Sequence, residues 1–350
     1  MKFGLHYLVS CSDSQSPVQR YADTLEQATS AEALGFESVW PVEQHFDQQL
    51  SALPCPAIML AAIAARTKTL RLGTAIVQLP LGHPLRIAEE IATLDVLSGG
   101  RVEFGVGRGA HPKHYANFGV ALLEGRERMI EALEYLKRAF TQEQFSFQGR
   151  FFQANDVCLV PKPVQRPHPP IRIAANGVET LEFAGRQGYP ILVAAHLNPI
   201  PRLAKLLPMY RAARKAGGSE AIDDDISILL PMYLDESESE VRKWAEPAVR
   251  AHVDLLASNL AAVADKLESG TDRKKMELAI KKVRETTYEE MNGSMAIFDT
   301  PQACLEQLTS LRESLNPGRV ICWFNLMGVI PHECVMRSME LFASKVLPYV

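Results

Sequence analysis

A glycine-rich turn within residues 101–119 carries the clearest pattern for ligand chemistry. The segment RVEFGVGRGAHPKHYANFG contains Gly105, Gly107 and Ala110, which spell G-x-G-x-x-A. In a dinucleotide-binding fold, this spacing joins a strand to the N-terminus of a helix that binds a pyrophosphate. Arg108 lies inside the turn, and a guanidinium can bind a phosphate through two parallel hydrogen bonds. The segment therefore predicts a phosphate site.

The position of this turn in the chain argues against a dinucleotide-binding fold. The fingerprint normally opens such a fold, whereas here it follows the fourth expected strand. Pro112 also falls where a continuous helix should already be under way. At the C-terminal end of a barrel strand, glycines would instead let a flat ligand or its phosphate approach the backbone closely. We therefore expect a phosphate site at the rim of a barrel.

Short apolar segments alternate with longer amphipathic segments along the 350 residues. The expected strands are 2–9, 37–42, 70–77, 101–107, 170–175, 191–195, 226–234 and 319–324. The expected helices are 17–35, 56–67, 84–97, 125–140, 178–188, 200–217, 300–315 and 332–347. Eight such βα units predict an α/β protein with a (β/α)8 TIM barrel, formed as a single domain over 1–350. A doubly wound sheet, which shows the same alternation, is the alternative.

Two stretches exceed what a minimal barrel needs. Residues 141–170 predict a β-rich insertion after the fourth helix, and residues 237–298 predict a helical insertion after the seventh strand. Within the second insertion, residues 265–294 are highly charged. This charge pattern indicates either a solvated helical face or a mobile lid over the barrel mouth.

Composition excludes several classes of function. The net charge is −4, so there is no basic excess with which to bind nucleic acid. No apolar run approaches the roughly 18 residues that span a membrane, and the N-terminus does not read as a signal peptide. Cysteine and histidine show no spacing typical of a metal site. We therefore expect a cytoplasmic protein without a metal, a nucleic-acid partner or a membrane anchor.

Several longer segments make the chain recognisable. Residues 73–109, 39–46, 162–190 and 299–308 resemble the bacterial luciferase-like family of flavin-dependent monooxygenases. The resemblance extends over essentially the whole chain. It implies a (β/α)8 barrel that binds reduced FMN delivered by a separate flavin reductase, and it implies O2 as the second substrate.

The resemblance also assigns residues to the FMN phosphate. Arg108 matches the arginine after the fourth strand that binds this phosphate, and Arg126 matches a second one on the next helix. Asn176, Gly177 and Thr180 match the turn and helix start that complete the phosphate site. A helix N-terminus suits this task, because its unpaired N–H groups attract an anion.

Other matches concern the flavin ring and the catalytic position. Ala75 and Ile76 match a segment that lies against the ring, where a cis peptide bond that does not involve proline is expected. Gly107, also assigned to cofactor binding, stands where luciferase has a reactive cysteine. Gln44 stands where luciferase has its catalytic histidine, and His45 is the histidine that remains. Glutamine cannot act as a general base, although its amide can orient a substrate.

From these matches we expect a monooxygenase that oxidises a small organic substrate, such as an aldehyde or another carbonyl compound. Gln44 and His45 are its candidate catalytic residues. The alternatives are hydride transfer with a deazaflavin or a flavin, and a non-catalytic flavin-binding protein. The loss of the catalytic histidine keeps the last alternative open.

The resemblance further implies a homodimer in which His45 contacts Glu89 of the second subunit. The helix 84–97 has an apolar face that would form the contact, made of Leu85, Ala88, Ala92 and Val96 with Ile91 beside it.

The remaining histidines and tryptophans allow several interpretations. His6 lies inside the first expected strand, where it either reaches the floor of the cavity or, as we expect, is a core histidine with its hydrogen bonds satisfied. His83 either faces the flavin or caps a helix. His111 and His114 either flank the ring or are solvated, and the tryptophans Trp40 and Trp323 belong to the core or the cavity wall.

Overall fold

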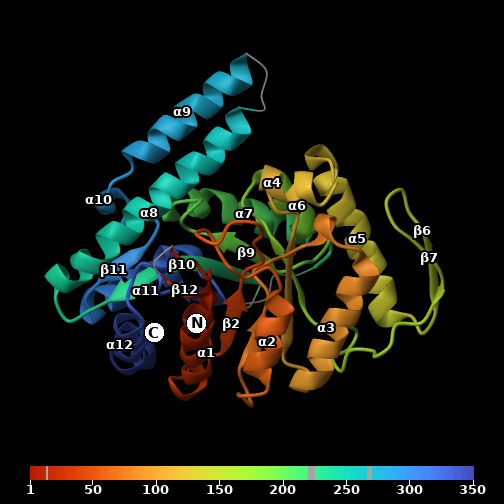
Figure 1. Ribbon diagram of the computed structural model, residues 1–350, viewed down its shortest axis with the longest axis horizontal. Coiled ribbons are helices and arrows are strands. Elements are labelled where there is room, and N and C mark those ends of the chain that lie inside the picture. The colour runs from red at the N-terminus through yellow and green to blue at the C-terminus, as the bar shows by residue number, and fades with distance from the viewer. Residues whose placement is uncertain (13–14, 220–224, 266–269) are drawn as a thin grey trace.

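Eight parallel strands close into a barrel in the computed structural model, which describes residues 1–12, 15–219, 225–265 and 270–350 (Figure 1). The barrel strands are β1 (Lys2–Tyr7), β2 (Ser38–Pro41), β3 (Arg71–Gly73), β5 (Val102–Gly107), β8 (Ile171–Ala174), β9 (Ile191–Ala194), β10 (Ile226–Leu234) and β12 (Arg319–Trp323). They follow one another around the barrel in chain order, and β12 pairs with β1 to close it. The predicted (β/α)8 barrel is confirmed, and the doubly wound sheet is excluded because the sheet closes.

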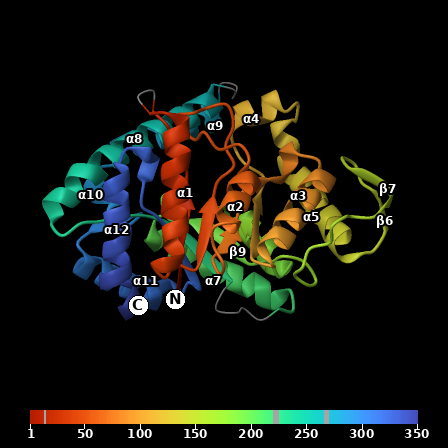
Figure 2. The same ribbon diagram turned by 60° about the horizontal axis from the view of Figure 1, so that its bottom comes forward.

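Helices cover the outside of the barrel, and Figure 2 shows α1 between α12 and α2. The covering helices are α1 (Pro17–Ala33), α2 (Pro56–Ala64), α3 (Pro84–Ser98), α5 (Gly125–Thr141), α6 (Val178–Arg186), α7 (Ile200–Ala216), α11 (Pro301–Leu315) and α12 (His332–Lys345). Several begin with proline, whose fixed φ suits the first helical turn. Short 3₁₀ turns occur at Leu79–Leu81, Leu122–Glu124, Leu326–Gly328 and Leu347–Tyr349.

The strand expected over 70–77 is interrupted. It consists of β3 and a two-residue strand, β4 (Val77–Gln78), with the cis peptide bond Ala75–Ile76 between them. The neighbouring strand β5 approaches this break closely, since a Cβ on Gly105 would lie 1.9 Å from the carbonyl oxygen of Thr74. Only glycine fits there, which gives one of the glycines in the fingerprint a purely structural reason.

Buried charges fill part of the barrel interior. Glu103 on β5 contacts Arg172 at 2.8 Å, Arg71 at 2.7 Å and Arg319 at 3.8 Å. Burial would raise the pKa of Glu103, but the three guanidinium groups lower it to about 2. These residues lie near the N-terminal ends of their strands, so the opposite end of the barrel is left for a ligand.

The two insertions differ from each other in structure. After α5, the chain forms an antiparallel pair, β6 (Phe145–Gln148) and β7 (Gln153–Val157), so only part of the insertion 141–170 is β-structure. After β10, α8 (Glu238–Ala264) and α9 (Thr271–Glu285) form an antiparallel hairpin that rises above the barrel (Figure 1). The short helix α10 (Tyr288–Met291) and the strand β11 (Ile297–Asp299) then return the chain to the edge of β10.

Candidate functional site

Two joined cavities open at the C-terminal ends of the barrel strands. One has a volume of about 460 Å³ and the other about 600 Å³. They share the lining residues Ile76, Gly109, Ala110, Ala174, Asn176 and Leu197. We call the first the inner cavity and the second the phosphate cavity, after the residues described below. The rim of the strands is where sites in this fold are normally built.

The phosphate cavity brings together all five residues that the sequence assigned to the FMN phosphate. Arg108 follows β5, Arg126 lies in the first turn of α5, and Asn176, Gly177 and Thr180 surround the start of α6; all five line the cavity. Gly177 is the N-cap of α6, and no side chain caps this helix. The N–H of Thr180 already donates to the carbonyl oxygen of Gly177, so the N–H groups of Val178 and Glu179 are the ones available to an anion.

Interactions within the chain engage two of the residues that line this cavity, Arg126 and Asn176. The side chain of Arg126 forms an ion pair with Glu179, which reduces the positive charge that faces the cavity. The side-chain oxygen of Asn176 accepts hydrogen bonds from the backbone N–H of Ala194 at 2.9 Å and from Asn198. Asn176 therefore fixes the loop after β8 against β9 through its amide oxygen, while its amide N–H groups can still donate to a ligand.

The arginine turn is held by short helix α4 (Pro112–Asn117), which the sequence did not predict. Tyr115 on α4 donates its hydroxyl hydrogen bond to the carbonyl oxygen of Arg108 at 2.5 Å. A Cβ on Gly125 would lie 2.2 Å from that hydroxyl oxygen, so glycine makes room for Tyr115. The pattern G-R-x-R around Gly125 carried no signal for this contact.

The inner cavity contains the segment expected to lie against the flavin ring. The peptide bond Ala75–Ile76 is cis, as expected, and both residues line the cavity. Gly107 lies behind this segment, because a Cβ at that position would meet Ile76 Cδ1 at 2.3 Å. Gly107 thus gives room to Ile76, which itself faces both cavities.

The two candidate catalytic residues are placed differently. Gln44 lines the inner cavity, and its amide oxygen has no hydrogen-bond partner among the described residues. His45 is not among the lining residues that the structure describes. Its Nε2 lies 3.0 Å from a carboxylate oxygen of Glu43, and its ring packs edge-on against Phe118 at 4.8 Å. The geometry therefore places Gln44 in the cavity and gives His45 a structural environment.

A group of aromatic residues lies at the inner end of the inner cavity, and the sequence analysis named two of them, His6 and Trp323, but not His196 and His252. We call His6, His196, His252 and Trp323 the inner cluster; their rings lie 5.2 to 6.0 Å from one another in four pairs. They come from β1, the loop after β9, α8 and β12, and all four line the cavity. Separation in the chain explains why no local pattern pointed to them.

Burial determines the charge of the inner cluster. It lowers the pKa of His6 to about 3 and that of His252 to about 4, and it lowers the pKa of His196 well below its usual value. Contrary to expectation, His6 is not fully satisfied: its Nδ1 has no hydrogen-bond partner in the described part of the chain. The inner cluster is therefore neutral and has ring atoms available to a ligand.

The other histidines and Trp40 have clearer structural roles. His83 caps α3, since its Nδ1 accepts a hydrogen bond from the backbone N–H of Leu85 at 3.2 Å. His114 is buried and lines the cavity, and burial lowers its pKa to about 4. His111 also lines the cavity and lies 3.2 Å from the side-chain oxygen of Asn259 on α8. Trp40 is fully buried in the barrel core.

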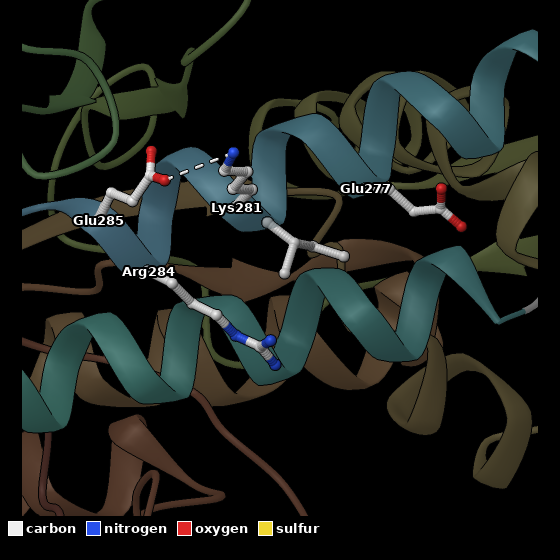
Figure 3. Close-up of a pocket in the computed structure, with 5 residues that line it drawn as sticks. Glu277, Lys281, Arg284 and Glu285 are labelled. Carbon is white, nitrogen blue, oxygen red and sulfur yellow. Dashed lines mark ion pairs between the residues drawn. The ribbon is translucent and has the colours of Figure 1, made fainter.

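The helix α8 covers the inner cavity along an apolar stripe. Its lining residues are His252, Leu255, Leu256, Asn259, Leu260 and Val263. The expected lid 265–294 follows directly in sequence, although residues 266–269 lie outside the described residues. The described residues of 270–294 do not line the cavity. Figure 3 shows instead that Glu277, Lys281, Arg284 and Glu285 of α9 border a surface hollow beside α8, with an ion pair between Lys281 and Glu285.

The apolar face of α3, which was expected to form a dimer contact, lies mostly against the barrel. Ala88, Ile91 and Ala92 are buried against the chain's own barrel. Glu89 lies 3.6 Å from Arg86 of the same helix. Three members of the predicted face therefore pack inward, whereas Val96 stays at the surface, and the dimer contact stays a prediction. The apolar side chains of α3 that remain exposed are Val96 and Leu97.

Two properties of the described residues bear on other classes of site. In the part of the chain covered by the structure, no helix is long and apolar enough to cross a membrane. Within the same residues, no group of three or more His, Cys, Asp and Glu side chains has the arrangement of a metal site.

Comparison with known proteins places this fold and site in a family. The family model for luciferase-like monooxygenases matches residues 1–316. The chain therefore belongs to the luciferase-like monooxygenase family, and it is a flavin-dependent monooxygenase by class. In structure it is similar to monooxygenase RslO1 from Streptomyces bottropensis, with a TM-score of 0.85, 30% identity and 99% of each chain covered.

Two relatives that are similar to this chain in sequence differ from each other in the chemistry that their names describe. The oxygenase component of flavin-dependent trigonelline monooxygenase from Acinetobacter baylyi is 29% identical over 250 residues, which cover 69% of this chain and 67% of the relative. The F420-dependent glucose-6-phosphate dehydrogenase from Amycolatopsis mediterranei is 28% identical over 259 residues, which cover 70% and 77%. The proteins similar to this chain therefore include both a flavin-dependent monooxygenase and an F420-dependent dehydrogenase.

Proposed function

We propose that the protein is an FMN-dependent monooxygenase that uses O2 to oxidise a neutral, mostly apolar organic substrate. The observation on which this proposal rests is the pair of joined cavities. In one, Arg108, Arg126 and the uncapped N-terminus of α6 surround a space suited to a phosphate, and the other is mostly apolar. A molecule with a flat ring and a phosphate tail fits this combination.

The residues of the chain would divide the work as follows. Arg108, Arg126, Gly177 and Thr180 hold the FMN phosphate, and Ala75 and Ile76 support the ring. Reduced FMN supplies the two electrons with which O2 is activated. The leucines of α8 keep water out of the inner cavity, where polar interactions gain strength from the low dielectric.

Gln44 is the candidate for orienting the substrate. Gln44 lines the cavity and its amide oxygen has no hydrogen-bond partner among the described residues, and a glutamine amide positions a ligand by hydrogen bonding rather than by proton transfer. His45 supports this position indirectly, because its bond to Glu43 fixes the residues next to Gln44. Glu43 in turn accepts a hydrogen bond from the backbone N–H of Gln78 at 3.1 Å.

A separate reductase supplies the reduced flavin in this proposal. The trigonelline relative is named as an oxygenase component, which supports a two-protein arrangement. Deazaflavin-dependent hydride transfer is the second candidate, because the glucose-6-phosphate dehydrogenase relative uses F420. Titrating the protein with FMN and with F420 and following their absorbance spectra separates the two. Oxygen uptake no faster than a reduced-flavin blank would favour a non-catalytic flavin-binding protein.

The phosphate assignment is tested by replacing Arg108. We expect Arg108→Ala to weaken FMN binding by about 1.5–3 kcal/mol, because a charge-assisted hydrogen bond is lost. Binding of riboflavin, which has no phosphate, should change little. Titration calorimetry with both ligands measures the difference.

Arg128→Ala is the matched control for this test. Arg128 lies on the same helix as Arg126, but it pairs with Glu124 at 2.9 Å and is not among the residues that line the phosphate cavity. This variant should bind FMN as the wild type does. If Arg108→Ala weakens FMN and riboflavin equally, the phosphate lies elsewhere.

A further inference from the structure

The substrate class can be narrowed from the charges around the inner cavity. No lysine or arginine is found among its lining residues in the described chain, and the only acidic one is Glu43. Glu43 is already engaged by His45 and by the backbone of Gln78. A carboxylate or an ammonium ion in this cavity would therefore lack an opposite charge, which is costly for a buried ion. The cavity favours a neutral ligand.

Two residues of the inner cluster offer complementary hydrogen-bonding atoms. Trp323 is 3% exposed and His6 is 6% exposed, and their ring centroids lie 5.2 Å apart in a perpendicular arrangement. The indole Nε1 and the imidazole Nδ1 both lack a partner among the residues that the structure describes. An unpaired polar atom at this depth is unfavourable unless a ligand or water completes it.

The roles of these two atoms follow from their chemistry. An indole N–H can only donate a hydrogen bond. Burial keeps His6 neutral, because it lowers the pKa of the imidazole to about 3, so one ring nitrogen carries a proton and the other carries a lone pair. Beside an indole that can only donate, Nδ1 complements a hydroxyl group when Nδ1 carries the lone pair and Nε2 carries the proton.

One hydroxyl group can satisfy both atoms. We propose that Trp323 and His6 bind a hydroxyl group of the substrate, with the indole donating to its oxygen and His6 Nδ1 accepting its proton. The substrate is then a neutral hydroxylated compound, such as a phenol or an enol, on a mostly apolar skeleton. Its apolar part lies along Leu255, Leu256 and Leu260 of α8. A carbonyl group elsewhere on the same molecule is compatible with this assignment.

This inference deepens the proposed function, on which it rests, by naming what its substrate carries. The test measures binding to the full-length protein without flavin, so that it does not depend on turnover. The probes are 2-naphthol, 2-methoxynaphthalene and 2-methylnaphthalene, which share one skeleton. The first donates and accepts a hydrogen bond, the second only accepts, and the third does neither.

The variants should separate the two hydrogen bonds. We expect His6→Phe to weaken 2-naphthol about three- to tenfold and to leave the other two probes unchanged. Trp323→Phe should weaken both 2-naphthol and 2-methoxynaphthalene by a similar factor and spare 2-methylnaphthalene. His6→Asn, which retains an acceptor oxygen, should bind 2-naphthol more tightly than His6→Phe does. His168→Phe and Trp244→Phe replace the same residue types away from the described cavity lining and should change nothing.

Three outcomes would overturn the inference. Wild-type protein that binds the three probes equally, or a variant that weakens all three by the same factor, would mean that no hydroxyl is recognised. If His6→Phe weakens FMN as much as it weakens 2-naphthol, the two atoms serve the flavin instead. Circular dichroism checks each variant, and His6→Asn and Trp323→Phe carry the test if His6→Phe does not fold.

The proposed function fails by a different measurement. Wild-type protein that binds 2-naphthol selectively but does not bind FMN would refute the FMN proposal and leave the hydroxyl site standing. Selective FMN binding without any preference for 2-naphthol would refute the hydroxyl site and leave the FMN proposal standing.

Discussion

At the scale of residues, burial controls the chemistry of the inner cavity. His6 and His252 have lowered pKa values because desolvation disfavours the imidazolium ion. A neutral imidazole can both donate and accept hydrogen bonds, whereas an imidazolium only donates. Low pKa values therefore preserve the acceptor on His6 at any pH near neutrality.

The same burial makes the fold sensitive to acid. In the unfolded chain histidine has a pKa of about 6.5, whereas folded His252 has a pKa of about 4. Between these values the unfolded state binds more protons, so stability falls as the pH is lowered through this window. We expect His252 alone to remove of the order of 1–2 kcal/mol between pH 7.5 and pH 5. Urea unfolding at the two pH values measures this loss.

Two variants isolate the contribution of His252. His252→Leu should reduce the loss of stability between pH 7.5 and pH 5. Leu256→Ala changes the same cavity-facing stripe without removing a titrating group, so it should lower stability equally at both pH values. The interpretation is wrong if His252→Leu leaves the pH dependence of the wild type intact.

At the scale of elements, α8 is the part that separates the inner cavity from solvent. Its apolar stripe faces the cavity, and α9 packs antiparallel on it with charged side chains at the surface (Figures 1 and 3). The charged segment was interpreted either as a solvated helical face or as a lid. In this arrangement the solvated helix is α9, and it lies on α8, the helix that covers the cavity. Whether the hairpin moves as a lid stays a prediction.

Limited proteolysis tests the lid. Trypsin should cleave α9, which contains six lysines and arginines, more slowly when FMN and 2-naphthol are both bound, because ligands stabilise the closed arrangement of α8. We expect a several-fold decrease in the cleavage rate, followed by mass spectrometry. Cleavage at Arg150, between β6 and β7, is the internal control and should not change. Equal slowing at both places would indicate a general effect of the ligands rather than a lid.

At the scale of the whole molecule, closure of the barrel determines which residues meet. Strands β5 and β8, which precede the phosphate cavity, lie opposite β12 and β1, which carry Trp323 and His6. One ligand site can therefore extend from one side of the barrel mouth to the other. The outer helices leave apolar side chains at the surface, with Ile58 on α2 and Leu97 on the adjacent α3 exposed by 71% and 66%.

The homodimer stays a proposal, now centred on these exposed side chains. A twofold contact through α2 and α3 would bury Leu97 of both subunits. We expect Leu97→Asp to weaken the dimer roughly a hundredfold, since each copy loses about 1.5 kcal/mol of apolar burial. Sedimentation velocity at micromolar protein measures the shift. Leu278→Asp, at a similarly exposed leucine on α9, should sediment as the wild type does. A wild type that is monomeric at every concentration contradicts the proposal.

Local sequence determined much of the fold and of the phosphate cavity. The eight strands and their covering helices could be predicted because apolar periodicity and helix-starting prolines are properties of neighbouring residues. Arg108 could be named from its place in the glycine-rich turn, and Arg126, Gly177 and Thr180 from the resemblance to the luciferase-like family; the structure brings all four into one cavity. The break in the strand 70–77 was not predicted, because it lies where the backbone of β5 approaches closely, and that approach involves residues far apart in the chain.

Only the tertiary structure decided the inner cavity. His6, His196, His252 and Trp323 come from two strands, a loop and a long helix, and no spacing in the chain relates them. Their neutrality and their unpaired ring atoms are consequences of burial, which depends on what the barrel places around each side chain. For the same reason the sequence could not divide the apolar face of α3 between the barrel and the surface: amphipathic periodicity shows that a face is apolar, but it does not show which of its residues the chain itself covers.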